Sequence, residues 1–321
     1  MKNAKNEMIW ANLVHLGYNF WVEEDAPPFE GSTEYIHASS TLLCNKTSWN
    51  EITEKMVEDG LNTILIDLGE GVRYESHPEI AVKGSWSVDE LKKELSRLRG
   101  MGLNPIPKLN FSASHDEWLG VYSRNLSSPT YYQVCKDLIN EVIDIFDNPD
   151  FFHLGMDEET YINQERYNHA LLRQHEAWWK DFYFLVDTVE RRNVRSWIWS
   201  DYLWDNQEQF LKKMPKSVLQ SNWYYRYSFN PNSNDEYTRM RVKAYLTLDE
   251  HGYDQIPTGS NWACAQNFGS TVQFCKDHIA PERLKGFLQT SWAPTIPERK
   301  YFNLAAVDFV GHAKRKYYSH Q

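Results

Sequence analysis

The chain has few cysteines, and their arrangement does not match any metal or redox motif. Its 321 residues include only Cys44, Cys135, Cys264 and Cys275. None of them forms a CxxC pair or has a histidine partner at zinc-finger spacing. This pattern excludes a zinc knuckle and a disulfide scaffold. We interpret the four as packing thiols and expect neither a bound metal nor a cofactor.

The sequence also lacks a long apolar run. Because no stretch of about 18 apolar residues is present, no membrane-spanning helix is expected. The N-terminal residues Met1 to Glu7 are polar and lack the apolar centre of a secretion signal. Two locations stay open, namely the cytoplasm and the outside of the cell after removal of an export signal.

Acidic residues outnumber basic residues in the chain. The chain has 34 Lys and Arg against 44 Asp and Glu, which gives a formal net charge of −10. A nucleic-acid surface requires clustered Lys and Arg, so nucleic acid is not an expected partner. A neutral substrate is the easier expectation for such a chain.

Aromatic residues, in contrast, are abundant. They make up 15% of the chain, with 13 Trp and 19 Tyr. Flat rings with a polar edge suit the faces of sugars, although aromatic residues also serve simply as core packing. Composition alone does not decide between these two uses.

The most informative stretch is Phe151 to Thr160, which reads Phe-Phe-His-Leu-Gly-Met-Asp-Glu-Glu-Thr. A short apolar run ends at Gly155, and Asp157, Glu158 and Glu159 follow, as expected for a buried strand that leads into a reactive loop. Neighbouring carboxylates in a partly dry cleft do not both ionise easily, so one of them can stay protonated and act as an acid. The alternative is that these carboxylates only cap a helix N-terminus.

Eight apolar, strand-like segments alternate with helical patterns along the chain. The expected strands cover 8–16, 63–68, 104–109, 151–154, 196–199, 217–221, 256–260 and 284–290. A repeat of roughly forty residues is typical of an α/β fold of the (β/α)8 barrel type, and we predict a single TIM-barrel domain over residues 1–321. A doubly wound open sheet is the main alternative, but it would gather functional residues at one crevice rather than after nearly every strand.

Several local signals predict where the helices begin. Ser48 with Glu51 and Ser87 with Glu90 match capping boxes, and Ser128 before a proline is typical of an N-cap. Ser233 is expected to cap a later helix in the same way. Two further helices are expected over 167–191 and 298–316. The third strand is unusual because it contains two prolines, which cannot donate to a strand ladder.

In a barrel, the residues that follow the strands meet at one mouth. Those residues are Tyr18, Trp21, Asp67, Glu70, Lys108, His115, Asp157, Glu158, Trp199, Asp201, Trp223, Tyr225, Trp262 and Trp292. The four tryptophans that follow successive strands are expected to wall a mostly apolar pocket about one sugar ring wide. We expect about two of the four to stack under loops instead.

The segment from His153 to Glu158 resembles the His-x-Gly-x-Asp-Glu signature of family 20 glycoside hydrolases, the β-N-acetylhexosaminidases, in which it ends the fourth barrel strand. Trp199, Trp223 and Trp292 are similar to the tryptophans that follow the fifth, sixth and eighth strands of that family. The order and spacing hold over roughly residues 60 to 295.

This resemblance implies a retaining, exo-acting hydrolase of β-linked N-acetylhexosamines or related sugars. Glu158 would be the general acid/base, and Asp157 would orient the 2-acetamido group of the substrate, which attacks the anomeric carbon in place of an enzyme nucleophile. The expected substrate-binding residues are Glu70, Lys108, His115, His153, Trp199, Asp201, Trp223, Tyr225, Trp262 and Trp292. His153 is expected to support the site by hydrogen bonding.

The chain departs from the family pattern at three places. The family has an arginine after strand one, where this chain has Gly17-Tyr18-Asn19. It has a tyrosine on strand seven, where this chain has Asn261-Trp262, and a glutamate after the eighth-strand tryptophan, where this chain has Ala293-Pro294. The contacts that bind the terminal sugar in the family are therefore replaced by others or absent here. The identity of the sugar and the requirement for an acetamido group stay open.

Three alternatives stay open, and the departures motivate the first and the last of them. A separate carboxylate, Asp201 or Glu70, would serve as nucleophile or base for Glu158, at about 5 Å in a retaining pair or about 6.5 to 9.5 Å in an inverting one. A metal-dependent barrel enzyme would use His115, His153, Asp157 and Glu158 as ligands, although no H-E-x-x-H spacing supports it. A carbohydrate-binding barrel without catalysis is the third alternative. A carbohydrate is the expected partner, and a homodimer is one way to shield the flank of the barrel.

Overall fold

The computed structural model describes residues 7–28 and 35–318. The polar N-terminal segment up to residue 6, and residues 29–34 of the long connection after the first strand, lie outside the described residues, so the expectations for those segments are not addressed by the structure.

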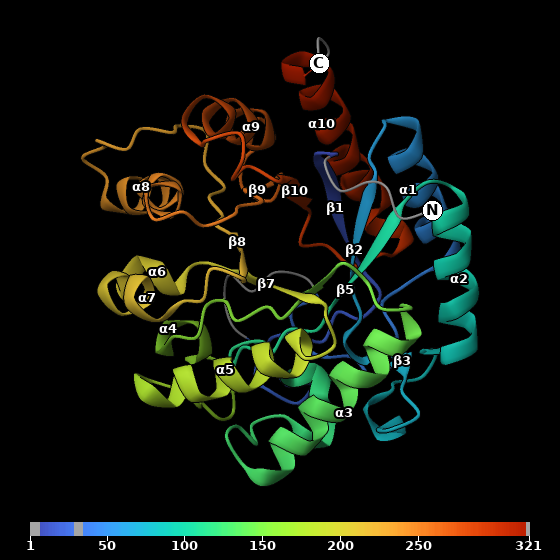
Figure 1. Cartoon of the computed structure of the whole chain (residues 1–321). Helices are drawn as coiled ribbons and strands as arrows, with labels where there is room; N and C mark the ends of the chain where they lie inside the picture. Colours follow the sequence, from blue (N-terminus) through green and yellow to red (C-terminus); the bar gives the residue numbers. More distant parts are fainter. Residues whose placement is uncertain (1–6, 29–34, 319–321) are drawn as a thin grey trace.

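Eight parallel strands form the centre of the molecule, and helices surround them (Figure 1). The neighbour order is β8-β7-β6-β5-β2-β1-β10-β9. The strands are β1 (Ile9–His15), β2 (Thr63–Asp67), β5 (Asn104–Lys108), β6 (Phe151–His153), β7 (Arg195–Trp199), β8 (Leu219–Ser221), β9 (Thr258–Ser260) and β10 (Gly286–Thr290). The backbone N–H of Ile256 donates to the Gln220 carbonyl (2.9 Å), and that of Thr258 donates to the Asn222 carbonyl (3.0 Å). These bonds join β8 to the β9 segment, so the predicted (β/α)8 barrel is confirmed and the open sheet is excluded.

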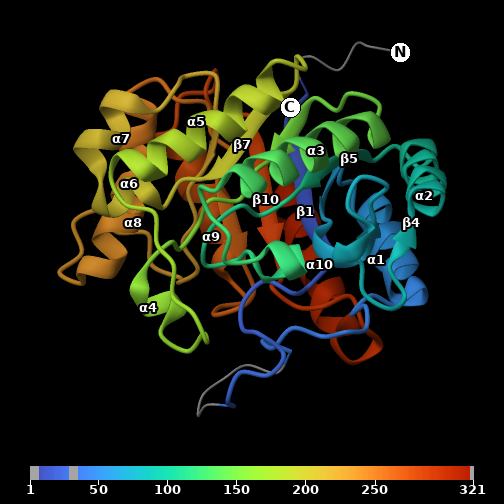
Figure 2. The same ribbon diagram turned by 90° about the horizontal axis from the view of Figure 1, so that it is seen from below.

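The outer layer consists of helices between successive strands, and Figure 2 shows it from a second direction. The helices are α1 (Lys46–Glu58), α2 (Val88–Gly100), α3 (Pro129–Ile145), α4 (Tyr161–Gln164), α5 (Glu176–Glu190), α6 (Tyr202–Asp205), α7 (Gln207–Lys213), α8 (Glu236–Glu250), α9 (Asn267–His278) and α10 (Lys300–Tyr318). Short 3-10 turns, among them η1 (Gly69–Gly71) and η4 (Pro297–Arg299), and a small β3–β4 pair (Val72–Arg73 with Trp86–Ser87) complete the described fold.

Helix starts follow the sequence signals in part. The capping box of Ser87 with Glu90 and the N-cap of Ser128 are confirmed. The expected box at Ser48 is wrong, because α1 begins earlier and Asn45 caps it by accepting a hydrogen bond from the Ser48 N–H (3.0 Å). The cap of α8 is Asp235 rather than Ser233, since the Asp235 carboxylate accepts the Thr238 N–H.

The long helix expected from 167 is also wrong, because α5 starts only at Glu176. The residues before it instead carry Arg173 into the interior, where its guanidinium binds the carboxylates of Glu159 (2.7 Å) and Asp181 (3.2 Å). A buried ion pair of this kind outweighs helical periodicity because the arginine needs partners once it leaves water.

The two prolines of β5 limit the pairing of that strand on one side. Backbone N–H groups alternate in direction along a strand, so Pro105 and Pro107 lie on the same side as the N–H of Leu109, which donates to the His153 carbonyl on β6 (3.1 Å). The β2–β5 ladder therefore has five register pairs, whereas β5 and β6 share only Lys108 with His153. The strand accommodates its two prolines because it forms few backbone hydrogen bonds with β6.

The apolar core has two parts. The larger part fills the space between strands and helices, and a smaller cluster inside the barrel includes Leu65, Trp197, Trp199 and Trp223. This inner cluster closes the barrel interior below the ends of the strands. The four cysteines are free, and no described helix has the length and apolarity needed to cross a membrane.

A close approach between β1 and β10 makes one glycine a sensitive position. A Cβ at Gly286 would lie 2.1 Å from the Ile9 carbonyl oxygen, whereas a Cβ at Gly269 in α9 meets nothing within 4 Å. We expect Gly286→Ala to lower the free energy of unfolding by about 2 to 4 kcal/mol, because the barrel backbone must shift. The matched change Gly269→Ala should raise it by up to about 1 kcal/mol through helix propensity. Urea unfolding measures both, and equal effects would contradict the expectation.

Candidate active site

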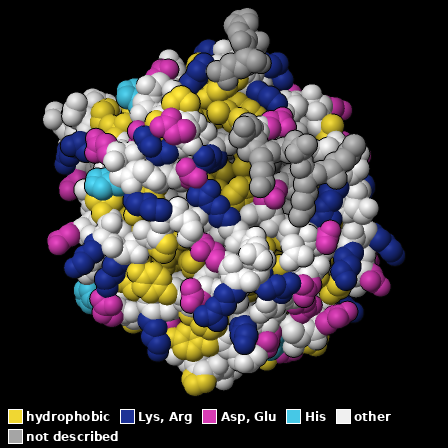
Figure 3. Space-filling model, viewed as in Figure 1, with side chains coloured by type: hydrophobic (Ala, Val, Ile, Leu, Met, Phe, Trp, Pro, Cys, Tyr) yellow, Lys and Arg dark blue, Asp and Glu magenta, His cyan; other side chains and the backbone are white. Residues whose placement is uncertain are grey.

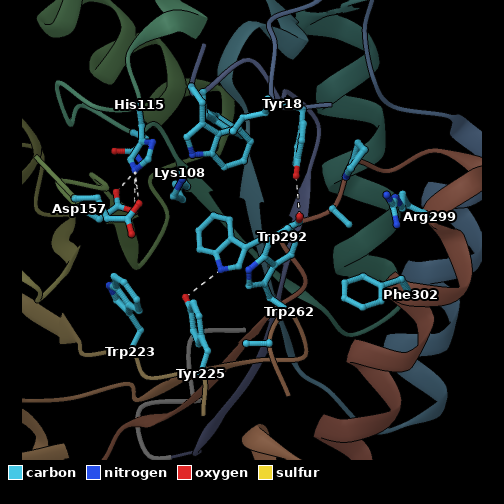
Figure 4. Close-up of a pocket in the computed structure, with 18 of the residues that line it drawn as sticks. Tyr18, Lys108, His115, Asp157, Trp223, Tyr225, Trp262, Trp292, Arg299 and Phe302 are labelled. Atoms are coloured by element: carbon cyan, nitrogen blue, oxygen red, sulfur yellow. Dashed lines mark hydrogen bonds and ion pairs between the residues drawn. The ribbon is translucent and has the colours of Figure 1, made fainter. Parts of the chain in front are cut away.

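The main cavity of the described chain lies at the carboxyl ends of the barrel strands. Its volume is about 870 Å³, and Figure 4 shows most of its lining. The lining residues are Tyr18, Phe20, Trp21, Ile36, Lys108, Asn110, His115, Asp157, Glu158, Trp223, Tyr225, Arg226, Tyr237, Arg241, Trp262, Ala263, Trp292, Ala293, Pro294, Arg299 and Phe302. A cavity of this size accommodates a sugar-sized ligand.

The loop after β6 adopts an unusual backbone that presents its carboxylates. Gly155, Met156 and Glu158 all have positive φ, at 72°, 74° and 55°. Asn110, which follows β5, holds this loop, because its Oδ1 accepts the Met156 N–H (3.2 Å) and its Nδ2 donates to Asp157 Oδ1 (2.8 Å). A Cβ at Gly155 would lie 1.9 Å from Asn110 Oδ1, so glycine is required here. Such strain persists only where the surroundings enforce it, and it is common at functional sites.

The third carboxylate of the triplet is directed elsewhere. Glu159 accepts hydrogen bonds from the Arg173 side chain at 2.7 and 2.8 Å and is buried against it. Arg173 also donates to the Phe111 carbonyl (2.6 Å), which ties the loop to the segment after β5. Glu159 thus anchors the loop, and only Asp157 and Glu158 of the triplet line the cavity.

His115 points toward Asp157 (Figure 4) and contacts both carboxylates through one ring nitrogen. Its Nε2 is 3.4 Å from Asp157 Oδ2 and 3.4 Å from Glu158 Oε2. Burial by itself disfavours the charged imidazole, but attraction to Asp157 and Glu158 dominates and raises the pKa of His115 to about 10. His115 is therefore a cation at neutral pH.

Asp157 has the opposite environment. Burial alone would raise the pKa of its carboxyl, but the nearby charge of His115, the charge of Lys108 and the hydrogen bond from the Asn110 amide lower that pKa to about 2. Asp157 is therefore held as an anion in the cavity wall. Its neighbour Glu158 is more open, with 38% of its side chain exposed.

Asp201 supports the loop from behind. Its Oδ2 accepts the backbone N–H of Glu158 (2.7 Å), and its Oδ1 lies 3.4 Å from the Trp223 indole nitrogen. Burial and repulsion by Asp157 raise the pKa of Asp201 to about 8. Asp201 is half-buried and is not part of the cavity lining, so it positions Glu158 through the backbone.

A second buried ion pair lies beneath the cavity. Lys108 donates to Asp67 Oδ2 (2.6 Å), and His15 Nδ1 lies 3.4 Å from the same oxygen. Burial lowers the pKa of His15, so this histidine is neutral at pH 7 and the charge of Asp67 is matched by Lys108. Lys108 thus supplies positive charge to the cavity floor while Asp67 stays outside the lining.

The aromatic wall is cross-linked by hydrogen bonds. The Trp292 indole N–H donates to the Tyr225 hydroxyl (3.0 Å), and the Tyr18 hydroxyl donates to the Trp292 carbonyl (2.7 Å). The Trp223 and Tyr225 rings stack with 5.0 Å between centroids. Trp262 is 49% exposed and stands in the cavity opening. Rings held in this way present flat apolar faces with polar edges.

Several residues expected at the mouth lie outside the cavity lining. Glu70 is buried, and its carboxylate accepts the backbone N–H groups of Tyr18 (2.7 Å) and Asn19 (3.2 Å), so it shapes the loop after β1. His153 accepts the Gly155 N–H at Nδ1 (3.0 Å). Trp199 packs inside the barrel, 4.4 Å from the His153 ring. Of the four strand-end tryptophans, three line the cavity and Trp199 serves as packing beneath them.

The cavity also contains residues that sequence reasoning missed. Asn110 follows the end of β5, so the rule that located Asp157 applies to it equally. The others are Arg226, Tyr237, Arg241, Arg299 and Phe302, which come from loops and helices behind the strand ends. Arg226 follows Tyr225 in the loop after β8. No strand-end signal marks the others, which reach the cavity through the packing of α8 (Tyr237, Arg241), η4 (Arg299) and α10 (Phe302).

The site contains one group that could hold a metal ion among the residues described. Ligand atoms of His115, Asp157 and Glu158 lie within 4.8 Å of one another. The further ligand expected from the sequence, His153, is not part of this group, and its Nδ1 accepts the Gly155 N–H. A metal would need His115 in its neutral form, which the raised pKa of this histidine opposes.

The barrel is similar to solved β-N-acetylhexosaminidase structures. The enzyme from Bacteroides fragilis aligns over 94% of this chain and 65% of its own, with a TM-score of 0.59 and 14% identity. The family 20 exo-β-N-acetylglucosaminidase from Vibrio harveyi aligns over 94% and 54%, with a TM-score of 0.59 and 12% identity. Dispersin B aligns over 84% and 95%, with a TM-score of 0.55 and 14% identity.

These likenesses define the class of fold. The distant resemblance of the sequence to family 20 is thus matched by a resemblance in structure, and this chain spans less than two thirds of the first two proteins. No sequence family matches the chain, and no curated protein matches it in sequence.

The charge of His115 predicts a pH-dependent contribution to stability. Since its folded pKa of about 10 exceeds the unfolded value of 6.5, this contribution is complete below pH 6.5 and is lost as the pH rises through 10. We expect His115→Gln to lower the free energy of unfolding by about 2 to 3 kcal/mol at pH 6 and by clearly less above pH 10.

Urea unfolding at a series of pH values measures this difference. His77→Gln is the matched control, because His77 lies 3.2 Å from Glu79 and 3.3 Å from Asp137 nearer the surface. Its effect should stay within about 1 kcal/mol. A His115→Gln effect that is the same at pH 6 and above pH 10 would show that the imidazole carries no charge.

Proposed function

We propose that the chain is a retaining glycoside hydrolase that removes β-linked N-acetylhexosamine or related sugars by substrate-assisted catalysis. The observation that carries this proposal is the pairing of the buried anion Asp157 with the more open Glu158 in an aromatic cavity. The similar structures support it, since they are those of β-N-acetylhexosaminidases and of an exo-β-N-acetylglucosaminidase in complex with N-acetylglucosamine.

In this proposal, Asp157 accepts the N–H of the 2-acetamido group. One of its oxygens is bound by Asn110 and the other lies near His115, so the carboxylate is fixed before substrate arrives. This fixed negative charge orients the acetamido oxygen toward the anomeric carbon and stabilises the positive charge that develops on the amide nitrogen. Preorganised charge in a dry site is an effective source of catalysis.

Glu158 performs the proton transfers. Its carboxylic acid donates a proton to the glycosidic oxygen as the bond to the anomeric carbon breaks, while the acetamido oxygen forms a new bond to that carbon. The resulting carboxylate then removes a proton from a water molecule, which attacks the anomeric carbon and restores the acetamido group. Each cycle consumes one water and leaves Glu158 protonated again.

The geometry favours this scheme over a separate nucleophile. Carboxylate oxygens of Asp157 and Glu158 lie within 4.8 Å of one another, a spacing that supports a retaining mechanism over an inverting one, for which roughly 6.5 to 9.5 Å is needed. The other two candidates, Asp201 and Glu70, are outside the cavity lining and are occupied by backbone N–H groups. Neither has direct access to a sugar in the cavity.

Hydrolysis of aryl β-glycosides with and without a 2-acetamido group tests the proposal. We expect cleavage to be confined to the acetamido sugars. Glu158→Gln should lower kcat/KM by about 10² to 10⁴ because the proton donor is removed. Asp157→Asn should lower it by about 10² to 10³ because the developing charge loses its counterion.

Glu165→Gln is the matched control, since Glu165 follows the same loop but is solvent-exposed beside Arg166. It should retain normal activity, and dialysis against EDTA should have no effect on any variant. Full activity in Glu158→Gln would refute the proposal, and stoichiometric loss of a metal together with activity would favour the metal-dependent alternative.

A further inference from the structure

The cavity is richer in basic than in acidic side chains, although the chain as a whole is acidic. Its basic lining residues are Lys108, Arg226, Arg241 and Arg299. Its carboxylates are Asp157 and Glu158. On the face shown in Figure 3, in contrast, the two signs are interspersed. In a chain with a net charge of −10, a cavity that has more basic than acidic side chains points to a negatively charged ligand.

Lys108 and Arg226 are each in an ion pair within the protein. Lys108 is compensated by Asp67 (2.6 Å), and Arg226 pairs with Asp235 (3.0 Å). The Arg226–Asp235 pair is about half exposed, and an exposed pair of this kind opens readily. Arg226 is thus available to a stronger anion, whereas Lys108 is committed.

Arg241 is different, because it has no anionic partner among the residues that the structure describes. Its guanidinium carbon lies 3.5 Å from the centroid of the Tyr237 ring and 4.0 Å from that of Trp204. Its Nε is buried without a hydrogen-bond acceptor. Burial lowers the pKa of Arg241, so the charged form is held there at a cost. A buried polar atom without a partner is rare in native structures and calls for an explanation.

The position of Arg241 is rigidly defined. The Asn222 amide, just after β8, donates to the Arg241 carbonyl (2.9 Å) and accepts the Trp204 indole N–H (2.8 Å). These bonds join α8, α6 and the end of β8. The Tyr237 and Trp204 rings lie against the guanidinium, and arginines stacked on aromatic rings in this way are common in sites that bind oxyanions.

A second guanidinium shares this platform. The Arg226 guanidinium carbon lies 4.1 Å from the Tyr237 centroid, on the ring that also contacts Arg241. Trp223 links the platform to the catalytic pair, because its ring lies 5.8 Å from the Arg241 guanidinium carbon and its indole faces Asp201. Since Arg241, Arg226 and Glu158 line the same cavity, one ligand can contact both the platform and Glu158.

We propose that Arg241, assisted by Arg226, binds an oxyanion substituent of the substrate, such as a sulfate or carboxylate on the sugar or its neighbour. This inference rests on the proposed glycosidase function and specifies its substrate class as acidic amino-sugar glycans. It replaces the neutral substrate expected from the net charge. Planar guanidinium groups bind such oxyanions through two parallel hydrogen bonds.

Calorimetry with the Glu158→Gln variant tests the proposal without turnover. The probes are N-acetylglucosamine 6-sulfate, glucuronic acid and neutral N-acetylglucosamine. We expect at least one acidic sugar to bind about tenfold to hundredfold more tightly than the neutral one, because an arginine contact to an oxyanion is a charge-assisted bond. Adding Arg241→Gln should abolish this preference, and Arg241→Lys should restore it in part.

Lys243→Gln is the matched control, because Lys243 lies on the same helix, is exposed and carries the same charge. It should leave the preference intact. If the Arg241→Gln variant does not fold, two other measurements replace it. Adding Arg226→Gln to the Glu158→Gln variant should weaken the preference for acidic sugars. Raising the salt concentration with the Glu158→Gln variant alone should weaken it as well. Equal binding of acidic and neutral sugars, or a preference that survives Arg241→Gln or high salt, would overturn the proposal.

The two proposals fail separately. Arg241-dependent binding of acidic sugars in a chain that cleaves no glycoside would refute the hydrolase and retain the oxyanion subsite. Cleavage of neutral acetamido glycosides that is unaffected by Arg241→Gln, together with equal binding of acidic and neutral sugars, would refute the oxyanion subsite and retain the hydrolase.

Discussion

The site depends on keeping the Asp157 carboxylate ionised in a place where burial opposes its charge. His115, Lys108 and Asn110 together overcome the desolvation cost and hold the pKa of Asp157 at about 2. The same interaction raises the pKa of His115 to about 10, so the two residues stabilise each other's charged form. Without this balance Asp157 would take up a proton, and the cavity would lose its fixed negative charge.

The sparse backbone pairing between β5 and β6 makes room for the loop that carries the carboxylates. Since Pro105 and Pro107 cannot donate toward β6, side chains take over the contact between the two strand ends. Asn110 bonds to Met156 and Asp157. The hydroxyls of Ser112 and Ser114 likewise donate to the carbonyls of Asp157 and Glu158. This polar framework enforces the positive φ angles of the loop, which a regular strand ladder would not permit.

The cavity wall combines two kinds of recognition. Trp223, Tyr225 and Trp292 provide flat faces held by their own hydrogen bonds and stacking. Arg241 and Arg226 provide charge on a platform centred on Tyr237. The aromatic residues suit any pyranose, whereas the arginines discriminate by charge, so the second group is the one that would select among sugars.

The sequence alone determined the barrel and the location of the loop that carries Asp157 and Glu158. Regular alternation of strands and helices is a local signal, and the strand-end rule then places Asp157 and Glu158 at one mouth. Only the tertiary structure decided which polar residues face the cavity. The carboxylates of Glu70 and Asp201 accept backbone N–H groups and do not line the cavity. Arg241 lines the cavity although it lies on a helix and has no strand-end signal. The physical reason is that a buried charge adopts whichever partner folding brings within hydrogen-bond reach, and that partner is distant in sequence.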